Sequence, residues 1–152
     1  MISDQSIERI QDKVRGLTKR NRGVSLGKII TDLNRVLRGW VNFYSLAEWA
    51  SQFLELEAWI RRKLRCYRLK QCKQGKSISK FLKKLGVPAS SAGLIAGSGK
   101  GWWRLSLSPP VHQAMNNAWF EEDKGLINLI KQRDLVKRSI ETAVCDIACT
   151  VV

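Results

Sequence analysis

Residues 26–44 read LGKIITDLNRVLRGWVNFY, and this segment carries the strongest structural signal in the chain. Its apolar side chains recur every three or four residues, at Leu26, Ile29, Ile30, Leu33, Leu37, Trp40, Val41 and Tyr44. This spacing places them on one face of an amphipathic helix of about five turns. Ser25 is a suitable N-cap, because its hydroxyl can accept a hydrogen bond from a first-turn amide. We expect Gly39 to let a neighbouring helix approach closely, the alternative being a glycine tolerated inside the helix at a cost of about 1 kcal/mol.

The same spacing continues on both sides of this segment and predicts an all-α fold. Residues 7–17 form the expected first helix, with Ser6 as its N-cap. Further helices are predicted over residues 51–67, 77–85, 89–96 and 109–120, with a compact turn at 100–104. Ile140, Val144 and Ile147 indicate one more helix near the end of the chain. We find no stretch that alternates apolar and polar residues as a half-buried strand does.

The charge of the chain is strongly positive. Its 152 residues include 27 Lys and Arg against 13 Asp and Glu, which gives a formal net charge of +14. The length suits one domain or two small ones, and a hydrophobic fraction of 44% excludes disorder throughout. No run approaches the roughly 20 apolar residues of a membrane span. No secretory signal opens the chain either, so we expect a cytoplasmic protein without a membrane partner.

The placement of the charge along the chain narrows the kinds of partner to be expected. Residues 61–84 hold eleven basic side chains and no acidic one, whereas residues 133–152 hold three of each sign. A solvated helix normally mixes the two signs, since like charges at helical spacing repel. Trp59, Tyr67 and Phe81 are interleaved with these cations, as aromatic residues are in RNA-binding surfaces. The pattern predicts nucleic-acid binding ahead of a membrane surface or a plain solvated face.

Phosphate contacts are predicted first from the densest part of this stretch. These residues are Arg61, Arg62, Lys63, Arg65, Arg68 and Lys70. A second group of cations follows further along the chain, at Lys80, Lys83, Lys84, Lys100 and Arg104. Both groups would contact the phosphates that dominate nucleic-acid affinity.

Other motifs give no support for an enzyme or a cofactor site. Gly97–Lys100 resembles a phosphate-binding loop, but Leu94 stands where its first glycine belongs and Gly101 where its Ser or Thr belongs. The cysteines, Cys66, Cys72, Cys145 and Cys149, lack zinc-site spacing, so we expect reduced thiols and no metal. His112 is the only histidine. Residues 121–123 (EED) could hold a divalent ion, but a solvated helix end is the favoured interpretation. No catalytic residue and no cofactor is predicted.

Five ordered blocks resemble the maturase-specific segment of bacterial group II intron-encoded reverse transcriptases. They are Leu33–Tyr44, Trp59–Arg65 with Lys70 and Gln71, Leu85–Pro88, Lys100–Ser106 and Ala114–Phe120. The resemblance implies a thumb-like helical bundle over residues 6–75 and a small, mainly helical maturase or DNA-binding-like region over 76–131. Residues 132–152 match nothing in that pattern.

The resemblance also implies what the chain does. Group II intron RNA is the expected partner, bound so as to assist splicing by stabilising the folded RNA. The polymerase palm and its metal-binding aspartates do not match any part of the chain, so RNA-directed DNA polymerase chemistry is not carried over. Two alternatives stay open: a thumb piece of a split or truncated reverse transcriptase, and a folded remnant without function. The resemblance also implies target DNA or a template–primer duplex as a further partner, and the split-protein alternative implies a separate polymerase fragment.

Overall fold

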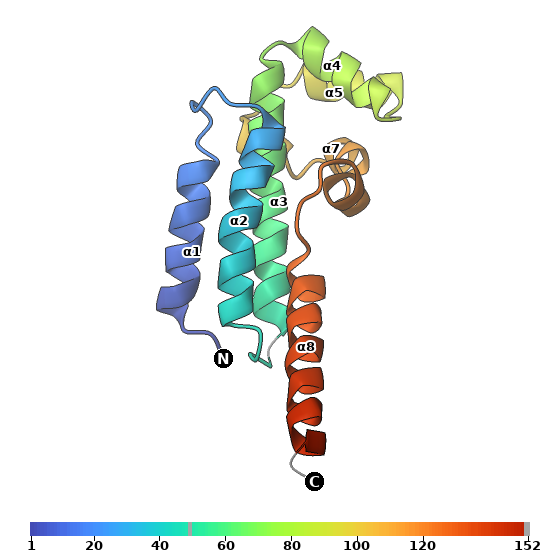
Figure 1. Cartoon of the computed structure of the whole chain (residues 1–152). Helices are drawn as coiled ribbons and strands as arrows, with labels where there is room; N and C mark the ends of the chain where they lie inside the picture. The colour runs from blue at the N-terminus through green and yellow to red at the C-terminus, as the bar shows by residue number, and fades with distance from the viewer. Residues whose placement is uncertain (49, 151–152) are drawn as a thin grey trace.

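The computed structural model describes residues 1–48 and 50–150, and among these residues it contains helices and no strand (Figure 1). The predicted all-α fold is confirmed. The elements of the described residues are α1 (Asp4–Leu17), α2 (Leu26–Phe43), α3 (Ala50–Cys72), α4 (Gly75–Lys84), α5 (Ala89–Ala96), α6 (Trp102–Leu105), α7 (Pro109–Ala114), a π-helix η1 (Trp119–Asp123) and α8 (Leu129–Thr150). Residues 151 and 152 of the predicted tail lie outside the described part of the chain.

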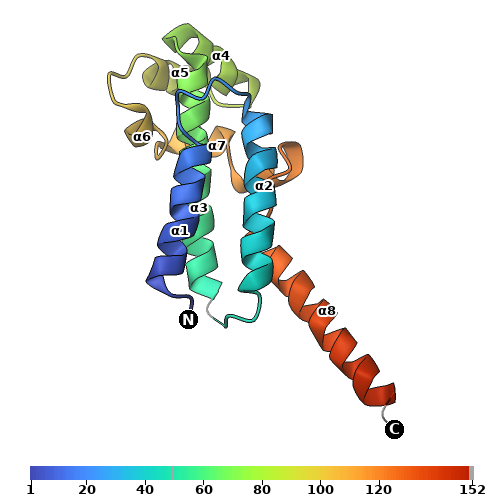
Figure 2. The same cartoon turned by 60° about the vertical axis from the view of Figure 1, so that its left-hand side comes forward.

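Helices α1, α2 and α3 form an antiparallel bundle around the apolar face of α2 (Figures 1 and 2). Ile29, Leu33 and Val41 of α2 are completely buried, as the spacing in residues 26–44 predicts. Phe53 and Leu64 of α3 are completely buried in the same core. Burial of such side chains contributes about 1.5–3 kcal/mol each, so this core dominates the stability of the bundle.

Two helix caps were predicted, and one of them is wrong. Ser25 caps α2, since its Oγ accepts a hydrogen bond from the Lys28 amide at 3.2 Å. For α1 the cap is Ser3, whose Oγ accepts from the Ser6 amide, and the helix starts at Asp4. Ser6 lies inside the helix instead, where its Oγ accepts a hydrogen bond from the Tyr44 hydroxyl at 2.7 Å. The predicted cap therefore links α1 to the end of α2.

The region after α3 is also helical but more irregular. Helices α4 and α5 pack on one another as a hairpin above the bundle (Figure 1). Gly75 fits this contact, because a Cβ there would lie 2.6 Å from the carbonyl oxygen of Ala96. Gly86 ends α4 with a φ of +90°, a left-handed conformation that favours glycine.

Two predictions for this region need correction. Residues 102–105 form the short helix α6 rather than a turn. Helix α7 starts at Pro109 as predicted but ends at Ala114, not near residue 120. The helix does not continue because the Asn116 side chain accepts a hydrogen bond from the Trp119 amide at 2.8 Å. This hydrogen bond starts η1 as a separate turn.

Helix α8 confirms the helix predicted near the end of the chain, but its far half is not packed. It begins at Leu129 beside α2 and α3 and then projects away from the bundle (Figure 2). Ile140, Val144 and Ile147 are 39%, 59% and 66% exposed. Their helical spacing therefore forms a stripe that no described part of the chain covers.

Side chains of the bundle hold the segment before α8 in place. Asn34 of α2 donates from Nδ2 to the Gly125 carbonyl at 2.7 Å and accepts from the Ile127 amide at 2.8 Å. Glu57 of α3 accepts from the Leu129 amide, which is one of the unpaired donors in the first turn of α8. These contacts join residues more than seventy positions apart in the sequence.

The acidic triplet at residues 121–123 takes part in the same attachment. Glu121 accepts hydrogen bonds from Asn128 Nδ2 at 2.8 Å and from Lys131 Nζ at 3.0 Å. The interpretation as a plain solvated helix end is therefore wrong for Glu121. No cluster of three metal-ligating side chains occurs within residues 1–48 and 50–150.

We predict that Asn34→Ala lowers the free energy of unfolding by about 1–3 kcal/mol, because it removes two hydrogen bonds that join distant segments. Urea denaturation followed by circular dichroism measures this change. Asn117→Ala is the control, since Asn117 is exposed and makes no hydrogen bond within the described residues. Equal stability of the two variants would contradict the role given to Asn34.

Candidate nucleic-acid interface

The predicted phosphate-binding stretch on α3 is divided between the interior and the surface. Arg65 is only 3% exposed, and its Nε donates a hydrogen bond to the Met115 carbonyl at 2.8 Å. Burial lowers the pKa of its guanidinium to about 10, with a smaller contribution from the charge of Arg61, so it stays protonated at neutral pH. Arg65 therefore holds the chain after α7 and is not available to a phosphate, which corrects the prediction for this residue.

Arg61 and Arg62 are also engaged within the protein. Arg61 forms an ion pair with the buried Glu57 at 3.6 Å. Arg62 lies over the Trp103 ring, with its guanidinium carbon 3.7 Å from the ring centroid, and donates to the Trp103 carbonyl at 3.0 Å. The contacts of Arg62 attach α6 to α3, and Arg61 pairs with the carboxylate that also accepts from the Leu129 amide at the start of α8. Both arginines therefore have a structural role.

The other predicted cations lie closer to solvent but do not share one place. Lys63 and Lys70 face α1, whereas Arg68 lies over the Phe81 ring at 4.5 Å. Lys80 and Lys83 line a shallow hollow between α4 and α5. The remaining exposed members of the second group are Lys84, Lys100 and Arg104.

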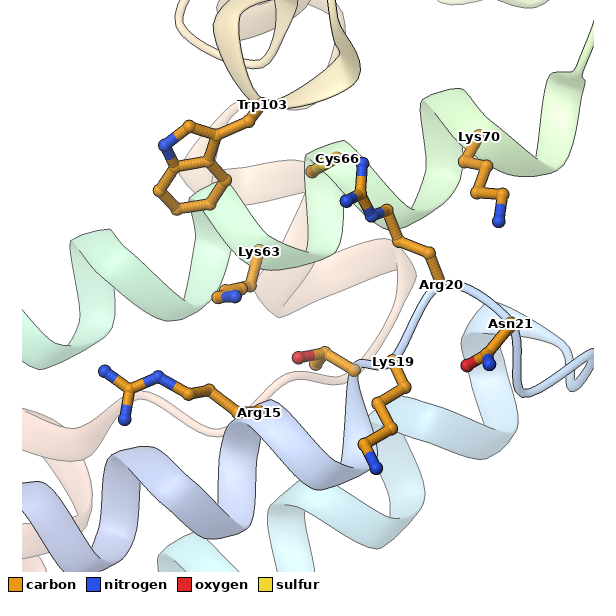
Figure 3. Close-up of a pocket in the computed structure, with 9 residues that line it drawn as sticks. Arg15, Lys19, Arg20, Asn21, Lys63, Cys66, Lys70 and Trp103 are labelled. Carbon is orange, nitrogen blue, oxygen red and sulfur yellow. The ribbon is translucent and has the colours of Figure 1, made fainter.

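Lys63 and Lys70 belong to a groove between α1 and α3, with a volume of about 580 Å³ (Figure 3). We call it the α1–α3 groove. Its lining consists of Arg15, Thr18, Lys19, Arg20, Asn21, Lys63, Cys66, Lys70 and Trp103. Five of these side chains are cations, and none of the described residues in the lining is a carboxylate. The groove therefore presents concentrated positive charge beside one aromatic ring.

The groove continues along the bundle into a second hollow of about 580 Å³. Arg20 and Lys70 line both hollows, and Arg68, Lys73 and Lys124 extend the basic lining of the second. A continuous path of cations suits an extended polyanion better than a small anion. This geometry favours a nucleic-acid backbone as the ligand.

The electrostatics around Lys63 support an anionic ligand. Its Nζ lies 5.4 Å from the Trp59 ring centroid and 5.2 Å from that of Trp103. Burial lowers the pKa of the Lys63 ammonium, and the charges of Arg15 and Arg20 lower it further. No carboxylate of the described residues forms an ion pair with Lys63. A phosphate that entered the groove would supply the missing negative charge.

The cations of α1 were not among the predicted site residues. Arg15 lies in the last turn of α1, and Lys19 and Arg20 follow just beyond the end of the helix. The sequence signal for Arg15 was its position beside the buried stripe of Ile10 and Val14, which fixes the direction in which its side chain points. In the sequence these three cations are sparser than those of residues 61–84.

Cys66 forms part of the groove floor and is 4% exposed. Burial raises the pKa of its thiol, although nearby cations act in the opposite direction. The thiol is therefore protonated at neutral pH, in keeping with the predicted reduced cysteine packed as a small apolar group.

No helix of the described residues is long and apolar enough to span a bilayer.

Comparison with known protein families identifies the family of this segment. The group II intron maturase-specific domain matches residues 7–86, which is more than half of the chain. The matched segment contains α2 and α3, the whole of α4, and every cation that lines the α1–α3 groove. No curated protein matches the chain.

We predict opposite effects for two neighbouring cations of α3. Arg65→Ala lowers the free energy of unfolding by about 1–3 kcal/mol, because it leaves the buried Met115 carbonyl without its donor. Lys63→Ala leaves stability unchanged or raises it, because it removes a partly buried charge among like charges. Urea denaturation of both variants measures the difference. Equal destabilisation would contradict this division of the stretch.

Proposed function

The chain belongs to the group II intron maturase-specific domain family, and on this premise we propose that it binds folded group II intron RNA and assists splicing by stabilising that fold. The observation that supports the proposal is the α1–α3 groove. Its five cations come from α1, the loop that follows α1, and α3. The lining contains no described carboxylate, and of the five only Arg15 forms an ion pair within the described residues, with Asp12. An RNA backbone supplies the complementary charge.

The helical bundle preorganises the groove for RNA binding. The core between α1, α2 and α3 holds the helices that carry Arg15 and Lys63, so little backbone order has to be created on binding. Preorganised cations favour a phosphate arrangement that already has the matching spacing. The chain therefore binds folded RNA more tightly than unfolded RNA, and this difference stabilises the fold by mass action.

In this proposal the chain contributes binding and no bond-making group. The lining of the groove offers cations, one amide, one hydroxyl, a protonated thiol and an indole ring. Of these groups the cations neutralise phosphates, and the indole ring of Trp103 is suited to stacking against a base or a sugar. The RNA itself would carry the splicing chemistry.

A second candidate is a thumb piece that completes a polymerase supplied on another chain. Phe43 and Leu46, at the end of α2 and in the loop that follows, are 80% and 68% exposed. Exposed apolar side chains of this size are suited to a protein partner. Copurification with a separately expressed polymerase palm, lost in Phe43→Ser, would favour this candidate.

We predict that the double variant Lys63→Glu and Lys70→Glu loses affinity for a folded group II intron transcript by at least about tenfold per contact. The physical reason is that both side chains face the groove without a carboxylate partner. Filter binding at several salt concentrations measures the loss, and the log–log salt slope should become shallower by about one per contact. Circular dichroism should still show the helices.

The matched control is Lys137→Glu with Arg138→Glu, which makes the same change of charge on α8, where the helix leaves the bundle (Figure 2). This control should bind the transcript nearly as tightly as the unmodified chain. An equal loss in both double variants would mean that net charge alone drives binding. Affinity that hardly changes with salt would overturn the proposal.

A further inference from the structure

A second cationic surface lies on the other side of α1, where it begins between α1 and α2 and continues over α2 alone. It consists of two adjacent hollows of about 330 and 580 Å³ that meet at Gly39. Arg9 and Lys13 of α1 line the first hollow, and Arg35 and Arg38 of α2 line the second. We call this area the α1–α2 surface. None of the described residues that line it is a carboxylate.

These four cations are free, unlike others on the same helices. Within the described part of the chain, no ion pair and no side-chain hydrogen bond involves the side chains of Arg9, Lys13, Arg35 and Arg38. By contrast, Arg15 pairs with Asp12 at 2.6 Å and Lys28 with Asp32 at 3.0 Å. The surface therefore holds positive charge that the protein itself does not use.

Gly39 at the centre of this surface has no packing role in the protein. A Cβ at this position would meet no atom of the described residues within 4 Å. The expected close approach of a neighbouring helix at Gly39 is therefore wrong, whereas Gly75 does make such a contact. A glycine inside a helix costs about 1 kcal/mol relative to alanine. Its presence here leaves the α2 backbone open to something outside the chain.

An unused donor lies beside the glycine. Trp40 follows Gly39 and lines the first hollow, and its Nε1 is buried without a hydrogen-bond partner within the described residues. A buried donor of this kind usually has a partner. The neighbouring cations and the open backbone together fit an anionic ligand that approaches α2 closely.

We propose that the α1–α2 surface binds the phosphate backbone of a second RNA segment, which approaches α2 at Gly39. This inference rests on the proposed function, since it takes RNA as the partner. Helix α1 then lies between two RNA contacts: Arg9 and Lys13 line the first hollow of the α1–α2 surface, while Arg15 lines the α1–α3 groove, as Figure 3 shows. By bridging two segments, the chain stabilises their arrangement in the folded RNA.

The decisive variant is Gly39→Ala, with Gly16→Ala as its matched control. Both glycines lie in helices, and a Cβ at either position meets nothing within 4 Å among the described residues. Alanine should therefore preserve or raise the melting temperature in both variants. Only Gly39→Ala should weaken binding of a folded group II intron transcript, by several fold, because only Gly39 lies on the α1–α2 surface.

A second variant tests the charges of the same surface. Arg35→Gln with Arg38→Gln should make the log–log salt slope for the transcript shallower by about two, one for each lost phosphate contact. If Gly39→Ala and this double variant both bind the transcript as tightly as the unmodified chain does, the inference is overturned and the proposed function stays intact. Absence of RNA binding by the unmodified chain would overturn both. Weak binding by Gly39→Ala together with tight binding by the Lys63 and Lys70 variant would support this surface and reject the groove.

Discussion

The buried apolar face of α2 is the constraint on which the rest of the structure depends. Ile29, Leu33 and Leu37 of this face are at most 1% exposed, and they fix the positions of α1 and α3 on either side. The cations of α1 and α3 repel one another across the α1–α3 groove, so the bundle needs this core to hold them together. The same packing that stabilises the fold thus creates the charge density that RNA would neutralise.

The basic stretch of α3 serves two purposes that helix geometry separates. Arg65 donates to the Met115 carbonyl of the chain after α7, and Arg61 pairs with Glu57, one turn earlier on α3, which also accepts from the Leu129 amide of α8. Lys63 and Lys70 face α1 and line the groove. One helix, α3, therefore provides both the attachment of the chain that follows it and the proposed RNA contacts. Substitutions of its cations differ in their effects on stability and binding even where the change of net charge is the same.

Much of the fold follows from periodicity, because burial repeats with the helical turn. The apolar residues of 26–44 and the Ser25 cap were predicted correctly. Burial of Arg65 could not be predicted, since it depends on a carbonyl fifty positions away. Ser6 was mistaken for a cap because Ser3, with the same side chain, lies one turn earlier. The contribution of α1 to the groove could not be predicted, because the sequence does not say which helix faces α3.

Chemical acetylation of lysines, with and without a folded group II intron transcript, tests the central claim most directly. It reports on each lysine separately in the unmodified chain. If RNA occupies the α1–α3 groove, Lys63 and Lys70 become protected while Lys137 on α8 keeps its reactivity. Protection confined to Lys80, Lys83 and Lys84, or equal protection of all lysines, would contradict the claim.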